Sequence, residues 1–525
     1  MTFNGKELRL LKPEKKSLLR FIFGRTGIIT LLMLAQCVLL LELPNQISVH
    51  FPLMFSLLNG TAATVMGLHI INTDAEPTIK ITWLAIVMLL PLFGALLYAY
   101  IHSDLGHRVL KRRVQNVIHI TSESLHTEEA VEKELQADDG SLLQLEAYLG
   151  RTGCYPVYKN TKVTYYPVGE LAFDAMLEQL KKAEHFIFLE YFIVEEGQMG
   201  GQILEILAQK ASQGLEVRIL YDGTCEFSTL PRDYPEKLRA LGIKCKMFAP
   251  IMPFVSTHYN YRDHRKIMVI DGKVSFTGGI NLADEYINKK VKHGHWKDNA
   301  IMLQGEATRS FTLMFLQMWH VNQDGPHDLH WLQAPLDPMP DAPGYVVPYG
   351  DCPLDDYRVG EMVYIDILSR AKKYVYIMTP YFIVDGELEN ALQFAAQRGV
   401  DVRMILPGIP DKKIVNALAK GSYEKLIRSG VKVYEYKPGF VHAKVMVSDG
   451  EKAVVGTINL DYRSLYHHFE CAAYLYKMPQ TIESIRQDVM DTLTKCRRIT
   501  LEMAKKQKLT TRWTAKLIRV LAPLL

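Results

Sequence analysis

The sequence has few cysteines and little net charge, and each scarcity excludes a class of protein. Its 525 residues include 7 cysteines, which are scattered and form no Cys-x-x-Cys pair. This pattern argues against a disulfide framework and a zinc knuckle, so we expect buried or incidental thiols. The formal net charge is only +4, whereas a dedicated nucleic-acid-binding protein usually carries a far more basic domain. Nucleic acid is therefore not an expected partner.

The usual signatures of a catalytic metal are also missing. The sequence contains no His-Glu-x-x-His motif and no cluster of cysteine with histidine. The metal-binding interpretation rests on two close pairs, His293 with His295 and His467 with His468. Lysines stand beside the first pair, and an ammonium group next to the ligands disfavours a cation. We expect no metal and no other cofactor.

Long apolar runs occur only near the N-terminus. After the basic segment 1–25, which we expect to be cytoplasmic, they cover Thr26–Leu43, Phe51–Ile71 and Ile81–Ile101. Two firm membrane spans are expected, and the weaker second run is uncertain. A cleaved signal peptide is the competing interpretation of the first run. However, no small-residue cleavage site follows it, and the third run would still anchor the chain.

Basic residues on both sides of the transmembrane region 26–101 constrain its topology. The N-terminal segment and the cluster Arg108–Arg113 should both stay in the cytoplasm. Both conditions hold for an even number of crossings, which we expect, with Phe51–Ile71 re-entrant or interfacial. Three full crossings would place the residues after the third apolar run outside the cytoplasm. The sequence therefore predicts a multi-pass membrane protein.

Beyond about residue 150 the chain repeats itself. Residues 183–197 read AEHFIFLEYFIVEEG and residues 371–386 read AKKYVYIMTPYFIVDG, and each is followed by a helical stretch and an apolar strand candidate. Strands that alternate with helices are typical of an α/β domain. We predict two similar α/β lobes at 151–335 and 336–500, a juxtamembrane linker at 102–150 and a basic amphipathic segment at 501–525.

Each lobe carries the same spaced set of polar residues. The first reads HRKIMVID and then FTGGIN, and the second reads HAKVMVSD and then VGTIN. Lysine, aspartate and asparagine follow the histidine at +2, +7 and +17 in both copies. Alternate residues of a strand point to the same face, so each histidine and lysine should project together. The candidate catalytic residues are His264, Lys266, Asp271, His442, Lys444 and Asp449, with Asn281 and Asn459 as candidate phosphate ligands.

Two histidines, two lysines and two asparagines are chemically complete for handling a phosphodiester. One imidazole can attack phosphorus while the other moves protons, and the lysines and asparagines can bind non-bridging oxygens. A single histidine or lysine at a strand edge is usually just solvated. Asp271 and Asp449 each precede a glycine at the junction of strand and turn, where a carboxylate more often orders the turn. We expect structural roles for these two aspartates.

The paired motifs resemble those of the phospholipase D superfamily. The stretches WLAIVMLLPLFGALLY, YEYKPGFVHAK and GTINLDYRSLYHHFE are similar to bacterial cardiolipin synthases in particular. The resemblance implies two pseudo-symmetric lobes, each a mixed sheet flanked by helices, preceded by transmembrane helices. It also implies a metal-free phosphohistidine intermediate, with His264 as nucleophile and His442 as general acid. Lys266, Lys444, Asn281 and Asn459 correspond to the residues that hold the phosphate.

The resemblance extends to the carboxylates that orient the motif histidines. In the second copy Glu470, eleven residues after Asn459, matches that carboxylate. The equally spaced position in the first copy is Lys292, so Asp298 in the sequence HWKDN is the expected equivalent. Which residue orients His264 stays open at this point.

The implied reaction transfers phosphatidyl from one phosphatidylglycerol to another at the bacterial cell membrane, giving cardiolipin and glycerol. Hydrolytic phospholipase D activity, another phosphatidyl transfer and nucleic-acid phosphodiester cleavage are the alternatives, and the sequence leaves the preferred donor and the oligomeric state open. The C-terminal segment suits either an anionic membrane surface or docking on the second lobe. Its apolar and basic residues are Trp513, Leu517, Val520, Leu521 and Leu524 with Arg512, Lys516 and Arg519.

Overall fold

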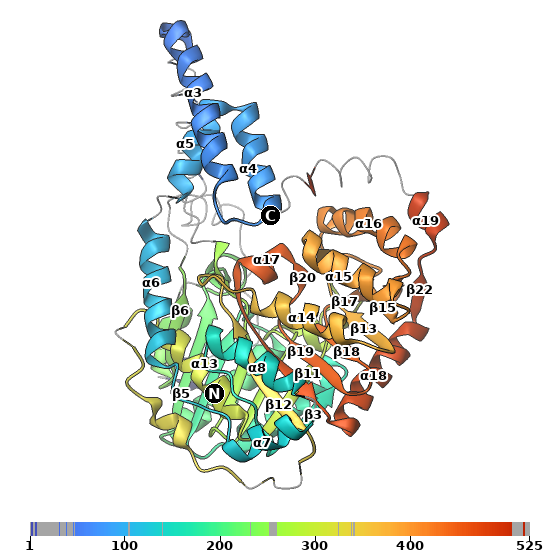
Figure 1. The fold of residues 1–525 in the computed structure, drawn as a ribbon. Helices are drawn as coiled ribbons and strands as arrows, with labels where there is room; N and C mark the ends of the chain where they lie inside the picture. The colour runs from blue at the N-terminus through green and yellow to red at the C-terminus, as the bar shows by residue number, and fades with distance from the viewer. Residues whose placement is uncertain are drawn as a thin grey trace.

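The computed structural model shows two α/β lobes packed side by side, with a bundle of apolar helices at one end (Figure 1). It describes residues 51–102, 105–138, 140–231, 233–250, 260–323, 325–337, 339, 342–506 and 518–519. It also describes a few isolated positions before residue 51. The prediction of an α/β fold built on mixed sheets with flanking helices is confirmed.

The first lobe contains a seven-stranded mixed sheet with the order β3-β11-β9-β8-β4-β5-β6. Its strands are β3 (Thr161–Tyr166), β4 (Phe186–Tyr191), β5 (Glu216–Asp222), β6 (Lys244–Phe248), β8 (Lys266–Ile270), β9 (Val274–Gly278) and β11 (Ala300–Gly305). Its helices are α9 (Gly169–Lys182), α10 (Gln198–Ser212), α11 (Cys225–Ser228), α12 (Tyr234–Ala240) and α13 (Thr308–Trp319). Helix α13 is buried over nearly its whole length, because it lies between this sheet and the second lobe.

The second lobe repeats this plan in a larger sheet with the order β12-β21-β19-β18-β13-β15-β16-β22. Its strands are β12 (Tyr345–Asp351), β13 (Tyr374–Met378), β15 (Asp401–Pro407), β16 (Lys432–Tyr436), β18 (Val445–Ser448), β19 (Lys452–Gly456), β21 (His468–Tyr476) and β22 (Cys496–Arg498). Its helices are α14 (Val359–Arg370), α15 (Gly386–Gln397), α16 (Lys413–Arg428), α17 (Tyr462–Tyr466), α18 (Pro479–Thr494) and α19 (Leu501–Lys505).

Short strands and 3-10 turns connect the two lobes or lie within their loops. Strand β7 (Arg262–Asp263) of the first lobe pairs with β21, and β10 (His295–Lys297) pairs with β17 (Gly439–Val441). The others are β14 (Phe382–Ile383) with β20 (Leu460–Asp461), β1 (Thr2–Phe3) with β2 (Lys6–Glu7), and the 3-10 turns η2 (Asp284–Ile287) and η3 (Leu329–Gln333). The two inter-lobe ladders decide the geometry of the site, as shown below.

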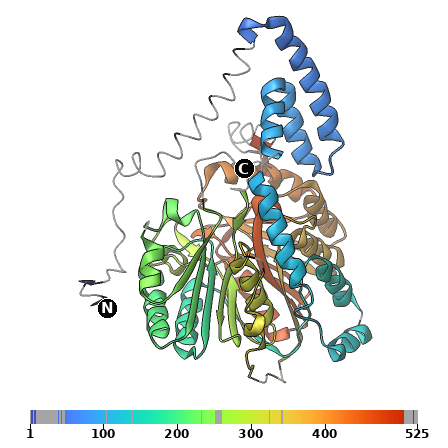
Figure 2. The ribbon, with the colours of Figure 1, turned by 90° about the vertical axis from the view of Figure 1, so that its left-hand side faces the viewer.

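The stretch 102–150, expected to be a juxtamembrane linker, is largely helical and packs against the lobes. Its helices are α6 (Leu105–Ile120), α7 (Glu129–Ala137) and α8 (Ser141–Thr152). Val114 and Val117 of α6 are buried, and the buried amide of Gln317 on α13 donates to the Thr121 hydroxyl just after α6. Helix α6 is therefore packed on the first lobe, and in Figure 2 it runs along the lobes toward the apolar bundle.

The apolar helices differ from the expected spans. The weaker run forms a single helix, α3 (Pro52–Ile71), which is long and apolar enough to cross a membrane. The prediction that Ile81–Ile101 forms one firm membrane span is wrong. The run divides into α4 (Pro77–Leu89) and α5 (Pro91–His102). Pro91 has no N–H to donate and clashes with the carbonyl one turn earlier, so it ends α4. Thr26–Leu43 lies almost entirely outside the described residues.

Of the basic C-terminal segment 501–525, the structure describes residues 501–506, which include α19, and the pair Ile518 and Arg519. Ile518 packs against Leu418 and Tyr462 of the second lobe. Arg519 donates to the Ser422 hydroxyl and lies 3.7 Å from a Glu389 carboxylate oxygen. These two residues contact the second lobe.

Candidate active site

The motif histidines follow the two short strands that cross between the lobes. In one ladder Asp263 of β7 pairs with Phe469 of β21, so the next residues along the two strands are His264 and Glu470. In the other ladder Val441 of β17 pairs with Lys297 of β10, which places His442 next to Asp298. Each ladder thus brings a histidine of one lobe beside a carboxylate of the other.

His264 is held by Glu470 of the second lobe. Its Nδ1 lies 2.8 and 2.9 Å from the two carboxylate oxygens, and its backbone N–H donates to the Phe469 carbonyl. The carboxylate also accepts from the hydroxyls of Ser464 and Thr457. With Nδ1–H donating to Glu470, the Nε2 lone pair of His264 is available as a nucleophile.

His442 is held by Asp298 of the first lobe. The distance between Nδ1 and Oδ2 is 2.7 Å, and the backbone N–H of His442 donates to the Lys297 carbonyl. The sequence resemblance matches Glu470 to the motif histidine of its own copy and leaves the residue that orients His264 open. The inter-lobe strand pairing instead places Glu470 beside His264 and Asp298 beside His442, so each carboxylate serves the histidine of the other lobe.

Burial and neighbouring ammonium groups keep both imidazoles neutral. Burial lowers the pKa of His264 well below its ordinary value, and the charges of Lys266 and Lys444 lower it further. Burial and Lys444 likewise lower the pKa of His442 to about 4, although Asp298 opposes this change. The pKa of Asp298 stays below its ordinary value because His442 and Lys444 outweigh its burial. A neutral imidazole is the form that a nucleophile requires.

The two motif lysines are buried beside the histidines. Burial lowers the pKa of Lys266 to about 8 and that of Lys444 to about 7. Each ammonium group donates to the backbone carbonyl of its own motif histidine. Two cations buried at 1% exposure each make this a site for an anion, since a bound phosphate would stabilise their charged forms.

The motif asparagines lie in the same buried region but differ in their contacts. Asn281 accepts from the backbone N–H of Ile193 and donates to the Tyr286 hydroxyl, so one N–H of its amide remains for a ligand. The side-chain oxygen of Asn459 has no hydrogen-bond partner within the described part of the chain.

The motif aspartates fix turns rather than facing the histidines. Asp271 follows β8 with φ of 54° and accepts from the backbone N–H groups of Glu184, His185 and Phe186. Asp449 has φ of 56° and accepts from the equivalent groups of residues 372–374. The same three-bond clamp in both lobes ties the histidine-bearing strand to its central neighbour.

A third imidazole lies beside His264. The His468 ring is 5.2 Å from that of His264, and the sequence interpretation considered it only as a metal ligand. His264, His468 and Glu470 offer ligand atoms within 4.8 Å of one another, so a cation is the competing occupant of this corner. Trp296 occupies the corresponding place beside His442, at 5.4 Å between ring centroids. His468 and Trp296 each stand two residues before the carboxylate that orients a motif histidine. This shared spacing is visible in the sequence and could have identified both residues.

The sequence matches family models over both lobes and the apolar bundle. A model described as "Cardiolipin synthase, PLD-like domain" matches residues 176–319 and 364–491. The chain belongs to this cardiolipin synthase family of phospholipase D-like proteins. A second model, described as "Phospholipase_D-nuclease N-terminal", matches residues 62–101. The cardiolipin synthase family is membrane-associated, in agreement with the apolar helix α3.

Bacterial relatives match most of the chain. A cardiolipin synthase of Alkalihalophilus pseudofirmus is 35% identical over 88% of this chain and 92% of its own length. An uncharacterized protein of Streptococcus mutans serotype c is 52% identical over 87% of this chain and 99% of its own length. The crystal structure of phosphatidylserine synthase from Haemophilus influenzae aligns with a TM-score of 0.55 at 14% identity. It covers 73% of this chain and 97% of that one, and this likeness concerns the fold alone.

Proposed function

We propose that the chain transfers a phosphatidyl group from one phosphatidylglycerol to the hydroxyl of a second, producing cardiolipin and glycerol. The crossed pairs His264–Glu470 and His442–Asp298, placed beside two buried lysines, carry this proposal. They supply a nucleophile, a proton carrier and charge for one phosphodiester. The relatives named as cardiolipin synthases support the choice of substrate.

In the first step Nε2 of His264 attacks the phosphorus of the donor. A phosphorus–nitrogen bond forms while the bond from phosphorus to the glycerol oxygen breaks, and His442 gives its proton to that oxygen. Glu470 stabilises the positive charge that develops on His264. Lys266, Lys444, Asn281 and Asn459 hold the non-bridging oxygens.

His442 must be protonated to act as an acid, although the empty pocket favours its neutral form. Binding a phosphodiester monoanion beside His442 adds a negative charge, and Asp298 already opposes the depression of its pKa. Both charges favour the imidazolium form in the complex. In the second step neutral His442 accepts the proton of the acceptor hydroxyl, whose oxygen attacks phosphorus and releases His264.

Incubation of purified protein with phosphatidylglycerol alone tests the proposal. We expect cardiolipin and free glycerol in equal amounts, identified by mass spectrometry of lipids and water-soluble products. Formation of phosphatidic acid as the main product would instead identify a hydrolytic phospholipase D with water as acceptor. Phosphatidylethanolamine added as a second donor decides which head group is preferred.

For the anchor, we infer that α3 crosses the membrane while α4 and α5 form a re-entrant hairpin on the catalytic side. At about 1.5 Å per residue, the 13 residues of α4 and 12 of α5 reach only about two thirds of a hydrocarbon core of roughly 30 Å. Asp74 and Glu76, between α3 and α4, line a cavity of about 480 Å³ together with Tyr466 and His468 of the second lobe. Both ends of the hairpin therefore lie near the lobes (Figure 1).

This arrangement keeps an even number of crossings if Thr26–Leu43 supplies the other one, and it makes the protein multi-pass with cytoplasmic lobes. The re-entrant segment is then the third apolar run and not the second. Cysteine labelling in intact cells tests it. With the native cysteines replaced, a cysteine at Leu90 should resist a membrane-impermeant reagent applied from outside, whereas one at Phe51 should react. Labelling at Leu90 would mean that the hairpin crosses the membrane.

A further inference from the structure

The two lobes differ at the outer edge of the repeated sheet. Strand β6 of the first lobe and β16 of the second occupy the same place, since each pairs in parallel with the strand before it. The carbonyls of Phe248 and Tyr436 accept from Gly223 and Gly408 at equivalent positions. This match aligns Lys244 with Lys432, and hence Cys245 with Val433.

The second lobe covers this edge with its own chain. Strand β22 pairs antiparallel with β16, and the N–H of Ile499 donates to the outward carbonyl of Val433 at 2.9 Å. The Arg497 guanidinium also contacts the carboxylate of Glu435 at 2.6 Å. A short cationic strand therefore completes the sheet, and one of its arginines meets the single carboxylate of the strand it covers.

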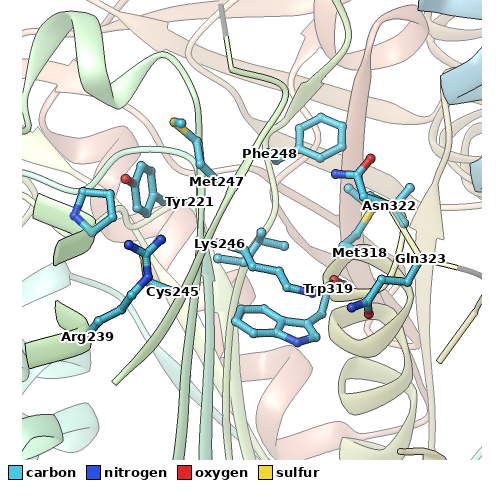
Figure 3. A pocket seen from close by; sticks show the side chains of 13 residues that line it. Tyr221, Arg239, Cys245, Lys246, Met247, Phe248, Met318, Trp319, Asn322 and Gln323 are labelled. Carbon is cyan, nitrogen blue, oxygen red and sulfur yellow. Dashed lines mark hydrogen bonds between the residues drawn. The ribbon is translucent and has the colours of Figure 1, made fainter. Parts of the chain in front are cut away.

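The first lobe has an open groove in the equivalent place. Strand β6 ends the sheet, and among the described residues no backbone bond reaches the N–H or C=O of Cys245 or Met247 from outside the sheet. A cavity of about 490 Å³ lies along this edge. In Figure 3, Tyr221 and Arg239 lie on one side of the strand, and Phe248 and Trp319 on the other.

The polar groups of the groove favour an acidic ligand. Its charged lining residues, Arg239 and Lys246, are both cationic, and Arg239 also lies 3.5 Å from the exposed carboxylate of Glu236. Lys246 donates to the Trp319 carbonyl and lies 4.6 Å from the centre of that ring, and no ion pair with a carboxylate is formed by it in the described structure. The hydroxyl of fully buried Tyr221 also lacks a hydrogen-bond partner within the described residues. An unpaired strand edge is a ready template for another strand.

We propose that β6 receives an extended acidic segment of another protein, which adds one strand to the first lobe as β22 does to the second. Its backbone would pair with Cys245 and Met247, while its carboxylates would face Lys246 and Arg239. The chain's own termini, 1–25 and 501–525, are basic and do not complement this groove. A second copy of β6 would bring the lysines of both copies along one seam, which is unfavourable.

Peptide binding to the full-length protein in detergent micelles tests the proposal. The probe is a fluorescein-labelled octapeptide in which pairs of glutamates alternate with pairs of valines, so that an added strand presents carboxylates on both of its faces. Its binding is followed by fluorescence anisotropy. We expect saturable binding that falls at least about tenfold in Lys246→Glu or Arg239→Glu, because each puts a like charge beside the peptide. Lys237→Glu is the matched control, since Lys237 lies on α12 but pairs with Asp233 outside the groove. The affinity of the Lys237→Glu variant for the peptide should equal that of the unmodified protein.

A second probe separates strand addition from simple charge attraction. The same peptide with an N-methyl group on every backbone amide keeps its charges but has no N–H to donate on either edge, and it should not bind. Retained lipid turnover shows that each variant is folded. The proposal is overturned by equal binding of the N-methylated peptide, by unchanged affinity in both charge-reversal variants, or by absence of saturable binding. Self-association of the unmodified protein that the unmethylated peptide displaces would replace the acidic partner with a second copy.

Discussion

The exchange of carboxylates between the lobes predicts which variants fail in the same way. If Asp298 serves His442, removing either one impairs protonation of the leaving group. If Glu470 serves His264, removing either one impairs attack on phosphorus. A donor with a good leaving group, such as a nitrophenyl ester of phosphatidic acid, needs little protonation. It should therefore rescue the first pair of variants and not the second.

The expected magnitudes follow from the groups removed. General acid catalysis contributes about 10²–10⁴-fold, so His442→Ala should lose that much with phosphatidylglycerol. A hydrogen bond to a charged group is worth about 1.5–3 kcal/mol, so Asp298→Asn should lose about 10- to 150-fold. On the nitrophenyl donor both losses should shrink to a few-fold. Glu470→Gln should lose about 10- to 150-fold on either donor, and His264→Ala should be inactive on both.

The assay is single-turnover release of glycerol or nitrophenol, with mass spectrometry of the protein. His442→Ala on the nitrophenyl donor should accumulate acid-labile phosphate on His264, because no base remains to activate the acceptor. Rescue of Glu470→Gln by the nitrophenyl donor would show that Glu470 serves the acid, which refutes the exchange. Phosphate found on His442 in His264→Ala would reverse the roles of the histidines.

Other predictions concern pH, metal and the anchor. The ammonium forms of Lys444 and Lys266 are present below pKa values of about 7 and about 8 and are lost as the pH rises through them. We therefore expect kcat/KM to fall above about pH 7, and Lys444→Arg to move this fall upward, whereas an unchanged profile would exclude these lysines. Activity should survive exhaustive chelation, and loss with EDTA that one divalent ion restores would favour a cation at His264, His468 and Glu470. A fragment starting at Leu105 should fold and turn over detergent-dispersed lipid but act poorly on vesicles. Insolubility in every detergent would place the apolar bundle in the core.

Much of the fold is present in the sequence as a repeat. Matching apolar strands and matched offsets from His264 and His442 predict two α/β lobes, because a duplicated pattern requires a duplicated backbone. The break at Pro91 was also readable, since proline ends a helix, but an uninterrupted apolar composition outweighed it. An apolar composition indicates that a segment prefers lipid or a protein core. Whether that segment forms one helix or two depends on its backbone, and here the proline divides it.

The partners of the histidines could not be predicted from spacing. Offsets along the chain describe one lobe at a time, and both Glu470 and Asp298 stand at plausible distances within their own copies. Their true partners depend on β7 with β21 and β10 with β17, ladders of two and three residues between the lobes. Ladders this short carry no hydrophobic period that a sequence would reveal.

These crossed ladders also explain why the chain needs two lobes for one phosphate. Each lobe supplies a histidine and a lysine, but the carboxylate that fixes the histidine tautomer comes from the other lobe. A separated lobe would keep its imidazole and lose the group that orients it. Pseudo-symmetry fixes the frame, while Trp296 and His468 make the surroundings of the two histidines unequal. This difference in surroundings allows one imidazole to attack phosphorus and the other to transfer protons, although the two lobes share one backbone arrangement.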